Sequence, residues 1–449
     1  MFAYPHGNLF YRRLTKSFPR IVRGEGCWLE DADGKRYLDA VGGAFVASLG
    51  HGNHEIADAL ADQARQVAYV NGTAFTTEPA EALAAELAPT LPGDLSHLYF
   101  LSSGSEAVEA ALKLARQYWV ERGAPRKHKI IALSPSYHGN TLLALSASAR
   151  EHYQTAFQSW LVDVVRVPVP CYRCACGGDD ASCPTCTGAA LEEAIVRAGA
   201  DTVAAFIAEP VGGSSTGAAV PRADYFRVVR DVCDRHEVLF IADEVLCGAG
   251  RTGTWWAIEP FGVAPDLMTI GKGIAAGYAP LSGVAAPRRI VDVLAEGSGA
   301  LLHAQTFSFH PVACAAGLAT VRALKARQLV QRCAELGGLL HAKLAALVGL
   351  PHVGAVRGRG LLAGVEFVND TKAGALLPRS LRFAETFAEQ ALAAGLVVWP
   401  NVGHIDGKSG DLVMLAPPFI VTEAELDELV TRFATALDRT LSTLAAGVA

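Results

Sequence analysis

A single lysine stands in a long stretch that is otherwise free of charge. Lys272 lies between Gly271 and Gly273 and is the only charged residue between Asp266 and Arg288. The residues just before it form an apolar run, so we expect its amine close to the protein interior. Burial lowers the pKa of an amine, and a neutral amine is a nucleophile. The alternative interpretation is an ordinary surface lysine.

An acidic residue ends a second apolar run. Asp243 directly follows Val238–Ala242, and open α/β sheets bind ligands at the carboxyl ends of their strands. A carboxylate that only caps a loop is the alternative. The next glycines (Gly248, Gly250 and Gly253) match the dinucleotide pattern G-x-G-x-x-G, but the segment TWWAIEPFG after them is a poor helix start. A nicotinamide oxidoreductase is therefore a weak alternative.

The segment FLSSGSEAVEAALKLARQYW passes from a strand pattern into a helix pattern. Ser103 and Glu106 fit a capping box, in which each side chain bonds to the backbone of the other residue. The amides of Gly104 and Ser105 would then lie in the first turn, where free N–H groups and the helix dipole bind anions. An ordinary capped helix is the alternative interpretation.

These three groups together predict a cofactor. Pyridoxal phosphate needs an anion site for its phosphate, a carboxylate that keeps its ring nitrogen protonated, and a lysine for a Schiff base. The sequence offers these groups at Gly104 and Ser105, at Asp243 and at Lys272.

The elements that must position these residues form a repeating pattern. Unbroken apolar runs alternate with helical stretches such as Glu106–Val120 and Ala223–His236, which predicts a mostly parallel seven-stranded sheet covered on both faces. The predicted strands are His97–Leu101, Lys129–Leu133, Val164–Val169, Val203–Ala208, Val238–Ala242, Leu267–Ile270 and Leu281–Ala285.

The pattern changes after about Ala315. Long helices (Ala315–Leu347 and Arg379–Ala394) surround short strands at Gly360–Phe367, Val397–Trp399 and Leu412–Leu415, which predicts a smaller α+β domain. Near the start, CWLEDADGKRYLDA predicts a hairpin that turns at Asp33-Gly34. We therefore expect residues 1–55 to join the small domain and the interface, 56–318 to form the large domain, and 319–449 to complete the small one.

Composition excludes several classes of protein. The chain has 449 residues, of which 51% are hydrophobic and 19% charged, with a net charge of −6. A disordered chain would be richer in charged residues. The chain also lacks the excess of basic residues that would suggest a nucleic-acid partner. Mean hydropathy is +0.25, but the longest uncharged stretch, which includes Gly299–Val321, is too polar to span a membrane. With no run of signal-peptide length at the N-terminus, we expect a cytoplasmic protein.

The motifs, taken in order, carry a family resemblance. From about Ile21 to Leu429 the chain resembles the class III aminotransferases, the fold type I pyridoxal phosphate enzymes that include ornithine, 4-aminobutyrate and ω-amino acid:pyruvate aminotransferases. The motifs are SSGSEAVEAALKLAR, SYHG, AEPV, DEVLCGAGRTG, TIGKGIAAGYAPLSG, TFSFHPVACAAGLA and VRGRGLLAGVEF. The resemblance implies an aminotransferase that works through a Lys272 aldimine.

The resemblance also implies roles for further residues at the cofactor. Tyr137 would stack on the ring, Val245 would pack on its opposite face, and Thr306 would reach the phosphate of the partner subunit's cofactor. The active site would then be complete only in a homodimer, and dimers could pair into tetramers. The full implied cofactor set is Ser103, Gly104, Ser105, Tyr137, His138, Glu209, Asp243, Val245, Lys272 and Thr306.

The implied substrate residues are Phe45, Tyr137, Glu209 and Arg357. Arg357 matches an arginine that grips a substrate α-carboxylate, a task that suits a bidentate guanidinium. Glu209 matches a glutamate that pairs with this arginine when the substrate lacks that group; a static ion pair between the domains is the alternative. Phe45 would wall the pocket.

Two departures from the family pattern bear on the substrate. Leu246 stands where ornithine and 4-aminobutyrate types have glutamine, which favours the amine:pyruvate branch. Some ω-transaminases carry a mobile arginine before Gly410-Asp411, where this chain has His404 and Lys408 instead. Arg357 is therefore the better carboxylate anchor.

Five cysteines fall within one short segment: Cys171, Cys174, Cys176, Cys183 and Cys186. Their spacing suits a structural zinc, but free thiols and a disulfide or redox role are alternatives. A zinc-binding interaction protein is thus an alternative hypothesis for the function of the chain. Transamination itself needs no metal, so we assign no metal ligand to the active site.

The reaction we expect moves an amino group from an amine, an ω-amino acid or an α-amino acid to a keto acid such as pyruvate. Relatives on the same scaffold include amino-acid racemases, an amino-acid decarboxylase and amino-phosphate lyases. All of them reuse the lysine, the acid and the phosphate site, so these remain the alternative functions.

Overall fold

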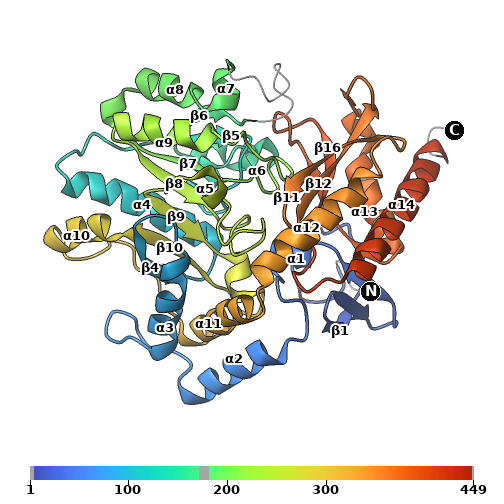
Figure 1. Ribbon diagram of the computed structural model, residues 1–449, viewed down its shortest axis with the longest axis horizontal. Helices are drawn as coiled ribbons and strands as arrows, with labels where there is room; N and C mark the ends of the chain where they lie inside the picture. The colour runs from blue at the N-terminus through green and yellow to red at the C-terminus, as the bar shows by residue number, and fades with distance from the viewer. Residues whose placement is uncertain (1–4, 171–181, 447–449) are drawn as a thin grey trace.

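A seven-stranded sheet with helices on both faces forms the larger part of the molecule (Figure 1). The computed structural model describes residues 5–170 and 182–446. The strand order is β4-β10-β9-β8-β7-β5-β6, and only β10 runs antiparallel to its neighbours. The strands are β4 (Leu95–Leu101), β5 (Lys129–Ser134), β6 (Val165–Pro168), β7 (Val203–Ala208), β8 (Leu239–Asp243), β9 (Leu267–Ile270) and β10 (Ser282–Pro287).

The sequence predicts all seven strands to within two residues at each end, which confirms the fold class. Their runs are unbroken because both faces are covered. On β8, Leu239 and Ile241 pack on one face of the sheet and Phe240 and Ala242 on the other. The first face is covered by α4 (Gly104–Glu121), α5 (Leu142–Ala147) and α10 (Arg288–Glu296), and the second by α3 (Glu78–Leu87), α8 (Ala190–Ala198), α9 (Tyr225–Arg235) and α11 (Pro311–Ala326).

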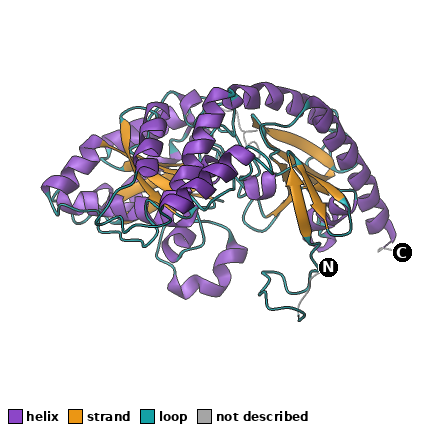
Figure 2. Cartoon of the chain, turned by 90° about the horizontal axis from the view of Figure 1, so that it is seen from below, coloured by secondary structure: helices purple, strands orange, loops and turns teal. Residues whose placement is uncertain are grey.

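Two smaller sheets make up the rest and lie apart from the large sheet (Figure 2). One has the order β11-β12-β16-β15, with β13 added to β12; the other has the order β1-β2-β3-β14. The strands are β1 (Ile21–Glu25), β2 (Trp28–Asp31), β3 (Arg36–Asp39), β11 (Val353–Arg359), β12 (Leu362–Asp370), β13 (Ala375–Leu376), β14 (Leu396–Val397), β15 (Trp399–Val402) and β16 (Asp411–Leu415).

The predicted hairpin is β2–β3, and Gly34 has the positive φ of 80° that its turn requires. Because β14 pairs in parallel with β3, the first residues of the chain share a sheet with the last third. The division into domains stays a prediction. Helix α11 continues across the predicted boundary at residue 318.

The predicted helix over Ala315–Leu347 is wrong in one respect. It is two helices, α11 and α12 (Leu329–Ala345), and Gln328 between them has a left-handed φ of 49°. Strands β1 and β11 were not expected, since neither has an apolar run. The remaining helices are α1 (Gly42–Phe45), α2 (His54–Gln66), α6 (Glu151–Gln154), α7 (Pro184–Thr187), α13 (Phe383–Ala393) and α14 (Glu423–Ala446).

The part of the molecule that holds the large sheet packs against the part that holds the small sheets at a buried junction. Arg251, which follows β8, donates from Nη1 to the carbonyls of Leu361 (3.1 Å) and Pro417 (2.7 Å) on the small-sheet side. An apolar cluster also spans the junction, with Leu246 from one side and Leu412 and Met414 from the other. No helix among residues 5–170 and 182–446 is both long and apolar enough to cross a bilayer.

Two adjacent glycines of α12 give a matched test of this packing. Gly337 is buried, and a Cβ there would lie 2.5 Å from the Cα of Gly360, whereas a Cβ on exposed Gly338 would meet nothing within 4 Å. We expect Gly337→Ala to lower the free energy of unfolding by about 2 kcal/mol through overpacking. Gly338→Ala should raise it by about 1 kcal/mol through helix propensity. Thermal midpoints that move in the same direction would contradict this packing.

Candidate active site

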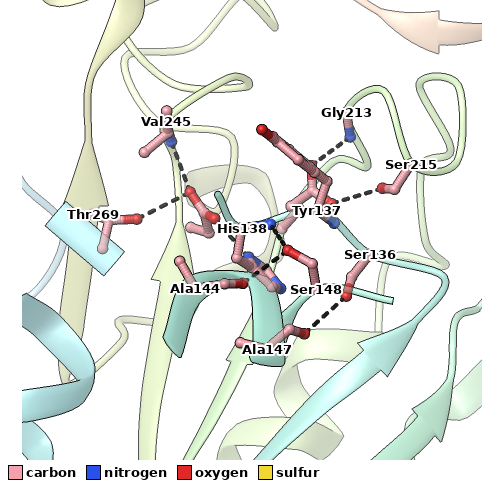
Figure 3. Close-up of polar contacts among 12 residues, drawn as sticks. Ser136, Tyr137, His138, Ala144, Ala147, Ser148, Gly213, Ser215, Val245 and Thr269 are labelled. Atoms are coloured by element: carbon pink, nitrogen blue, oxygen red, sulfur yellow. Dashed lines mark hydrogen bonds and ion pairs between the residues drawn. The ribbon is translucent and has the colours of Figure 1, made fainter. Parts of the chain in front are cut away.

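The Asp243 carboxylate at the end of β8 is held by three donors (Figure 3). Its Oδ1 accepts from the Val245 amide at 3.1 Å and from Thr269 Oγ1 at 3.0 Å. Its Oδ2 lies 2.6 Å from His138 Nδ1, and both of these side chains are buried. A carboxylate with this many hydrogen-bond donors is fixed in direction.

His138 is fixed from its backbone as well as from its ring. Its amide donates to Ser148 Oγ at 2.8 Å, and that hydroxyl donates to the carbonyl of Ala144 at 2.8 Å (Figure 3). Its buried Nε2 has no hydrogen-bond partner among the described residues. The imidazole is thus positioned against Asp243 with one ring nitrogen still able to bond.

Lys272 follows β9 and adopts a left-handed φ of 45°. Burial lowers the pKa of its amine, while the nearby carboxylates of Asp243 and Glu209 oppose that shift. The neutral amine is thereby made accessible beside two acidic groups, which is the state a nucleophile or proton acceptor needs.

The predicted anion cradle lies at the N-terminus of α4. Ser103 is the N-cap: its Oγ accepts from the Glu106 amide at 3.3 Å and donates to the Glu106 carboxylate at 2.9 Å. Backbone packing here is tight, because a Cβ on Gly104 would lie 2.6 Å from Val245 Cγ1. Likewise, a Cβ on Gly139 would lie 2.6 Å from Ser105 Oγ.

Val245 connects the cradle to the lysine. Besides its contact with Gly104, its Cγ1 would lie 3.3 Å from a Cβ on Gly271, the residue before Lys272. The cradle, the acid and the lysine therefore surround one place, at the carboxyl ends of β8 and β9, as expected for a ligand site in an open α/β sheet.

Tyr137 and Glu209 lie side by side at this place. The Tyr137 amide donates to Glu209 Oε2 at 3.4 Å. Glu209 also accepts from the Gly213 amide at 2.8 Å and from Ser215 Oγ at 2.8 Å (Figure 3). Burial raises the pKa of Glu209. Its carboxylate is thus occupied by groups of its own loop.

Phe45 forms part of an apolar wall. It is buried, and its ring centroid lies 5.5 Å from that of Trp399 at the start of β15. Leu246 and Met414 belong to the same cluster. The residue that follows Val245 is therefore part of an apolar surface and offers no hydrogen bond.

Arg357 on β11 contacts both its own sheet and the loop that follows β7. Its Nη2 donates to the Thr216 carbonyl at 3.0 Å, and its Nη1 lies 3.5 Å from Glu366 Oε2 on β12. The glutamate that the resemblance would pair with it, Glu209, is bound by Gly213 and Ser215 instead. Glu366 is therefore one ionic partner of Arg357 in this structure.

Thr306, like Ser103, is a predicted cofactor residue at the surface of the described chain. It is exposed, and its carbonyl accepts from Tyr69 Oη at 2.9 Å. Its neighbour Gln305 donates to Glu106 Oε1 at 2.6 Å, which ties this segment to the start of α4. The cap of α11 is His310, so Thr306 is not a helix cap.

Part of the cysteine cluster lies outside the described residues, namely Cys171, Cys174 and Cys176. Cys183 is half-buried and Cys186 is buried, at and within α7. The part of the chain that the structure describes contains no group of three or more His, Cys, Asp or Glu side chains placed to hold a metal ion.

Sequence reasoning missed several residues of the site. Thr269 is the one polar residue of β9 and is paired in register with Asp243, so a lone hydroxyl in an apolar strand was a usable signal. Ser148 and Glu366 carry no such signal, because their roles depend on contacts between distant segments. Trp399 stands in a short run that predicts a strand but not its direction.

These residues fit pyridoxal phosphate. The amides in the first turn of α4, at Gly104 and Ser105, suit a phosphate, because free N–H groups at a helix N-terminus bind anions. The fixed Asp243 carboxylate suits a protonated ring nitrogen, and the amine of Lys272 has the lowered pKa that a carbonyl-binding lysine needs.

Comparisons with known proteins agree with this fit. The family model for class III aminotransferases matches residues 11–437. An uncharacterized aminotransferase of Schizosaccharomyces pombe is 40% identical, over 97% of this chain and 96% of that one. The putrescine–pyruvate aminotransferase of Pseudomonas aeruginosa is 34% identical, over 97% and 94%. The ω-transaminase of Pseudomonas jessenii, solved with pyridoxamine phosphate (PMP), has a TM-score of 0.88 at 32% identity, covering 96% of this chain and 94% of that chain.

Fold and site together define a pyridoxal phosphate-dependent enzyme of fold type I. The chain belongs to the class III aminotransferase family, and it is an aminotransferase that uses pyridoxal phosphate. Its substrates are accordingly amines and keto acids.

The hydrogen bond from Thr269 to Asp243 can be tested by cofactor affinity. We expect Thr269→Val to weaken binding of pyridoxal phosphate to the apoenzyme about tenfold, because one acceptor of a charged group loses its donor. Titration followed by absorbance measures this. Thr320→Val is the control: that buried hydroxyl bonds to the Ala316 carbonyl within α11, so its loss should affect stability and leave cofactor affinity unchanged. Equal affinities in both variants would contradict the role of Thr269.

Proposed function

We propose that the enzyme transfers an amino group from an amine or an ω- or α-amino acid to a keto acid such as pyruvate. The observation that carries this proposal lies at Gly217. A Cβ there would meet Leu412 Cδ1 at 3.0 Å and Arg357 Nη2 at 3.1 Å. A guanidinium thus lies directly beside the apolar wall, so one pocket can offer a carboxylate anchor and an apolar surface.

In this proposal Lys272 does the proton transfers. Its Nζ would hold the cofactor, and once a substrate amine takes its place there, the same amine is the base placed to remove and return a proton at the substrate. The lowered pKa makes the amine a base at neutral pH. When bound, pyridoxal phosphate supplies the electron-withdrawing ring that makes that proton acidic.

The other cofactor residues orient rather than react. Asp243, held by His138 and Thr269, keeps a positive charge favourable at the ring nitrogen. Tyr137 and Val245 would hold the ring of the cofactor between them. Backbone amides of Ser103, Gly104 and Ser105 would bind its phosphate at the start of α4.

Substrate selection is assigned to a second set of residues. Arg357 binds the carboxylate of the keto acid, and Phe45, Leu246 and Trp399 bind the apolar part of the amine. Support comes from the apolar cluster around Phe45 and from relatives named for amine donors, such as the putrescine–pyruvate enzyme.

We also propose a homodimer with shared active sites, in a cytoplasmic protein. Thr306 is exposed, next to Phe307, which is 54% exposed, and near Leu302, which is 66% exposed. Large apolar side chains gathered around a predicted site residue are typical of an interface. Sedimentation velocity measures whether the chain is a dimer and whether two dimers pair into a tetramer.

The decisive experiment is an amino-donor screen with pyruvate and 2-oxoglutarate as acceptors. Stoichiometric consumption of the keto acid supports the proposal. Turnover of an amino acid with no acceptor present would instead favour the racemase, decarboxylase or lyase alternatives. Lys272→Ala is expected to lose activity by at least about a thousandfold, because it removes the base, and borohydride should no longer fix the cofactor to the chain.

The pH dependence of cofactor capture tests the electrostatics of Lys272. Only the neutral amine reacts, so the rate at which the apoenzyme captures pyridoxal phosphate should rise as pH rises through the lowered pKa of Lys272. Glu209→Gln removes a carboxylate that favours the lysine cation. The pKa should then fall further, and the profile should move to lower pH by roughly half a unit to one unit.

Glu192→Gln serves as the control for this shift, because Glu192 pairs with Arg235 and His236 on the outside of α8 and α9. A profile that moves equally in both variants, or upward in Glu209→Gln, would refute the assignment.

A further inference from the structure

The apolar wall of the site includes a residue with an unfavourable backbone conformation. Phe45 has a φ of 65°, in the left-handed region that a bulky side chain rarely adopts. Gly42 and Gly43, just before it, have φ values of 55° and 67°. Strained turns of this kind persist only where surrounding groups hold them, and they cluster at functional sites. We therefore looked for what holds residues 40–50, here called the wall loop.

One buried carboxylate holds the tip of the wall loop. The side chain of Asp39, the last residue of β3, is 0% exposed. It accepts hydrogen bonds from the Val41 amide at 3.3 Å and from the Gly43 amide at 2.9 Å. The Phe45 amide in turn donates to the carbonyl of Val41 at 3.0 Å. Asp39 thus fixes the peptide groups on which the position of Phe45 depends.

A histidine just beyond the wall loop binds the same carboxylate. His51 Nε2 lies 2.9 Å from Asp39 Oδ2, and the histidine side chain is 24% exposed. The backbone of His51 is fixed by a bridge to Gly26, with hydrogen bonds of 2.8 Å and 3.0 Å. A Cβ on Gly24 would lie 2.8 Å from His51 Cβ, so this residue is closely packed. Asp39 and His51 therefore tie the two ends of the wall loop together.

The aromatic partner of Phe45 is placed by the same strand. Asp39 lies opposite Val397 in the parallel pairing of β3 with β14. Trp399 follows two residues later, and its ring centroid is 5.5 Å from that of Phe45. Both aromatic rings of the wall are thus positioned relative to Asp39.

The part of the wall loop beside Lys272 has bonds of its own. Ser48 Oγ donates to the carbonyl of Gly273 at 3.3 Å, and the Ser48 carbonyl accepts from the Phe419 amide at 2.8 Å. Loss of the Asp39 bonds therefore loosens the turn at Phe45 and leaves the contact beside Lys272 in place. Such a change affects the binding of a substrate more than the rate of the chemical step.

We propose that Asp39 and His51 are positioning residues for substrate selection. They hold Phe45 in its strained turn and thereby set how well the enzyme binds the apolar part of an amine. A wall that is already ordered when the amine arrives does not have to be ordered by binding. This inference rests on the proposed function, in which Phe45 binds the apolar part of the amine. Neither Asp39 nor His51 touches a reacting atom.

The first test compares Asp39→Ala with the wild-type holoenzyme, with benzylamine as donor and pyruvate as acceptor. We expect the KM for benzylamine to rise about tenfold, the size of effect that a changed contact in an apolar pocket produces. The KM for pyruvate should stay unchanged, because pyruvate offers the wall only a methyl group, and kcat should change little.

Asp31→Ala is the matched control. Asp31 is also buried, and it accepts from the amides of Asp33 and Lys35 at 3.0 Å in the turn of the β2–β3 hairpin. This variant should lower the thermal midpoint and leave both KM values unchanged. If the KM for benzylamine rises equally in Asp31→Ala and Asp39→Ala, the role assigned to Asp39 is wrong.

A double-variant cycle separates positioning from a general loss of structure. Phe45→Ala should raise the KM for benzylamine at least as much as Asp39→Ala does. Adding Asp39→Ala to Phe45→Ala should then raise this KM no further, because residues that act through one another have non-additive effects. A KM that rises by the same factor in both backgrounds overturns the proposal.

If Asp39→Ala does not fold, the partly exposed His51 decides. His51→Ala should raise the KM for benzylamine and leave that for pyruvate unchanged. His51→Gln, whose amide can still donate to Asp39, should restore most of the affinity for benzylamine. An unchanged KM in His51→Ala, or no recovery in His51→Gln, counts against the proposal.

The proposed function and this inference fail in different measurements. If the wild-type holoenzyme consumes no keto acid with any donor, the proposed function fails, and no variant is needed to see this. If it consumes pyruvate with other donors while benzylamine neither reacts nor inhibits, the wall selects no apolar amine. That result overturns this inference alone.

Discussion

The Asp243 carboxylate is the constraint around which the site is built. A charged group at the buried end of a strand must have partners, and here an imidazole, a hydroxyl and an amide supply them. Each partner brings its own element: His138 from the loop after β5, Thr269 from β9, and Val245 from the turn after β8. Satisfying one charge therefore fixes the positions of Lys272, three residues beyond Thr269, and of Val245, which packs on the anion cradle.

The same logic explains what sequence reasoning could reach. All seven strands of the large sheet could be predicted because strands buried on both faces are apolar throughout, and the capping box at Ser103 is a local signal. The residues of the cradle, the acid and the lysine were identified because their chemistry is carried by adjacent residues. The break at Gln328 could not be seen, because the apolar pattern of α11 continues into α12 without interruption.

Long-range pairing accounts for the rest. Glu366 and Arg357 are nine positions apart on a hairpin whose strand β11 has no apolar run, and His404 lies far from both in sequence. The resemblance offered Glu209 as the partner of Arg357, since a motif names residue types but not the contacts between distant segments. That Glu366 is also a partner follows only from the register of β11 on β12.

Arg357 and Trp399 come from the five-stranded sheet, whereas Asp243, Thr269 and Lys272 come from the large one. The groups proposed to choose the substrate and those proposed to carry out the reaction thus belong to different structural layers, joined at a packed seam. Substitutions in the first layer can alter which molecules are accepted without disturbing the second. An ancestral enzyme with this arrangement could change its range of amine substrates while the residues that carry out the reaction stayed the same. Laboratory evolution of substrate range should therefore begin with substitutions on β11, β12 and β15.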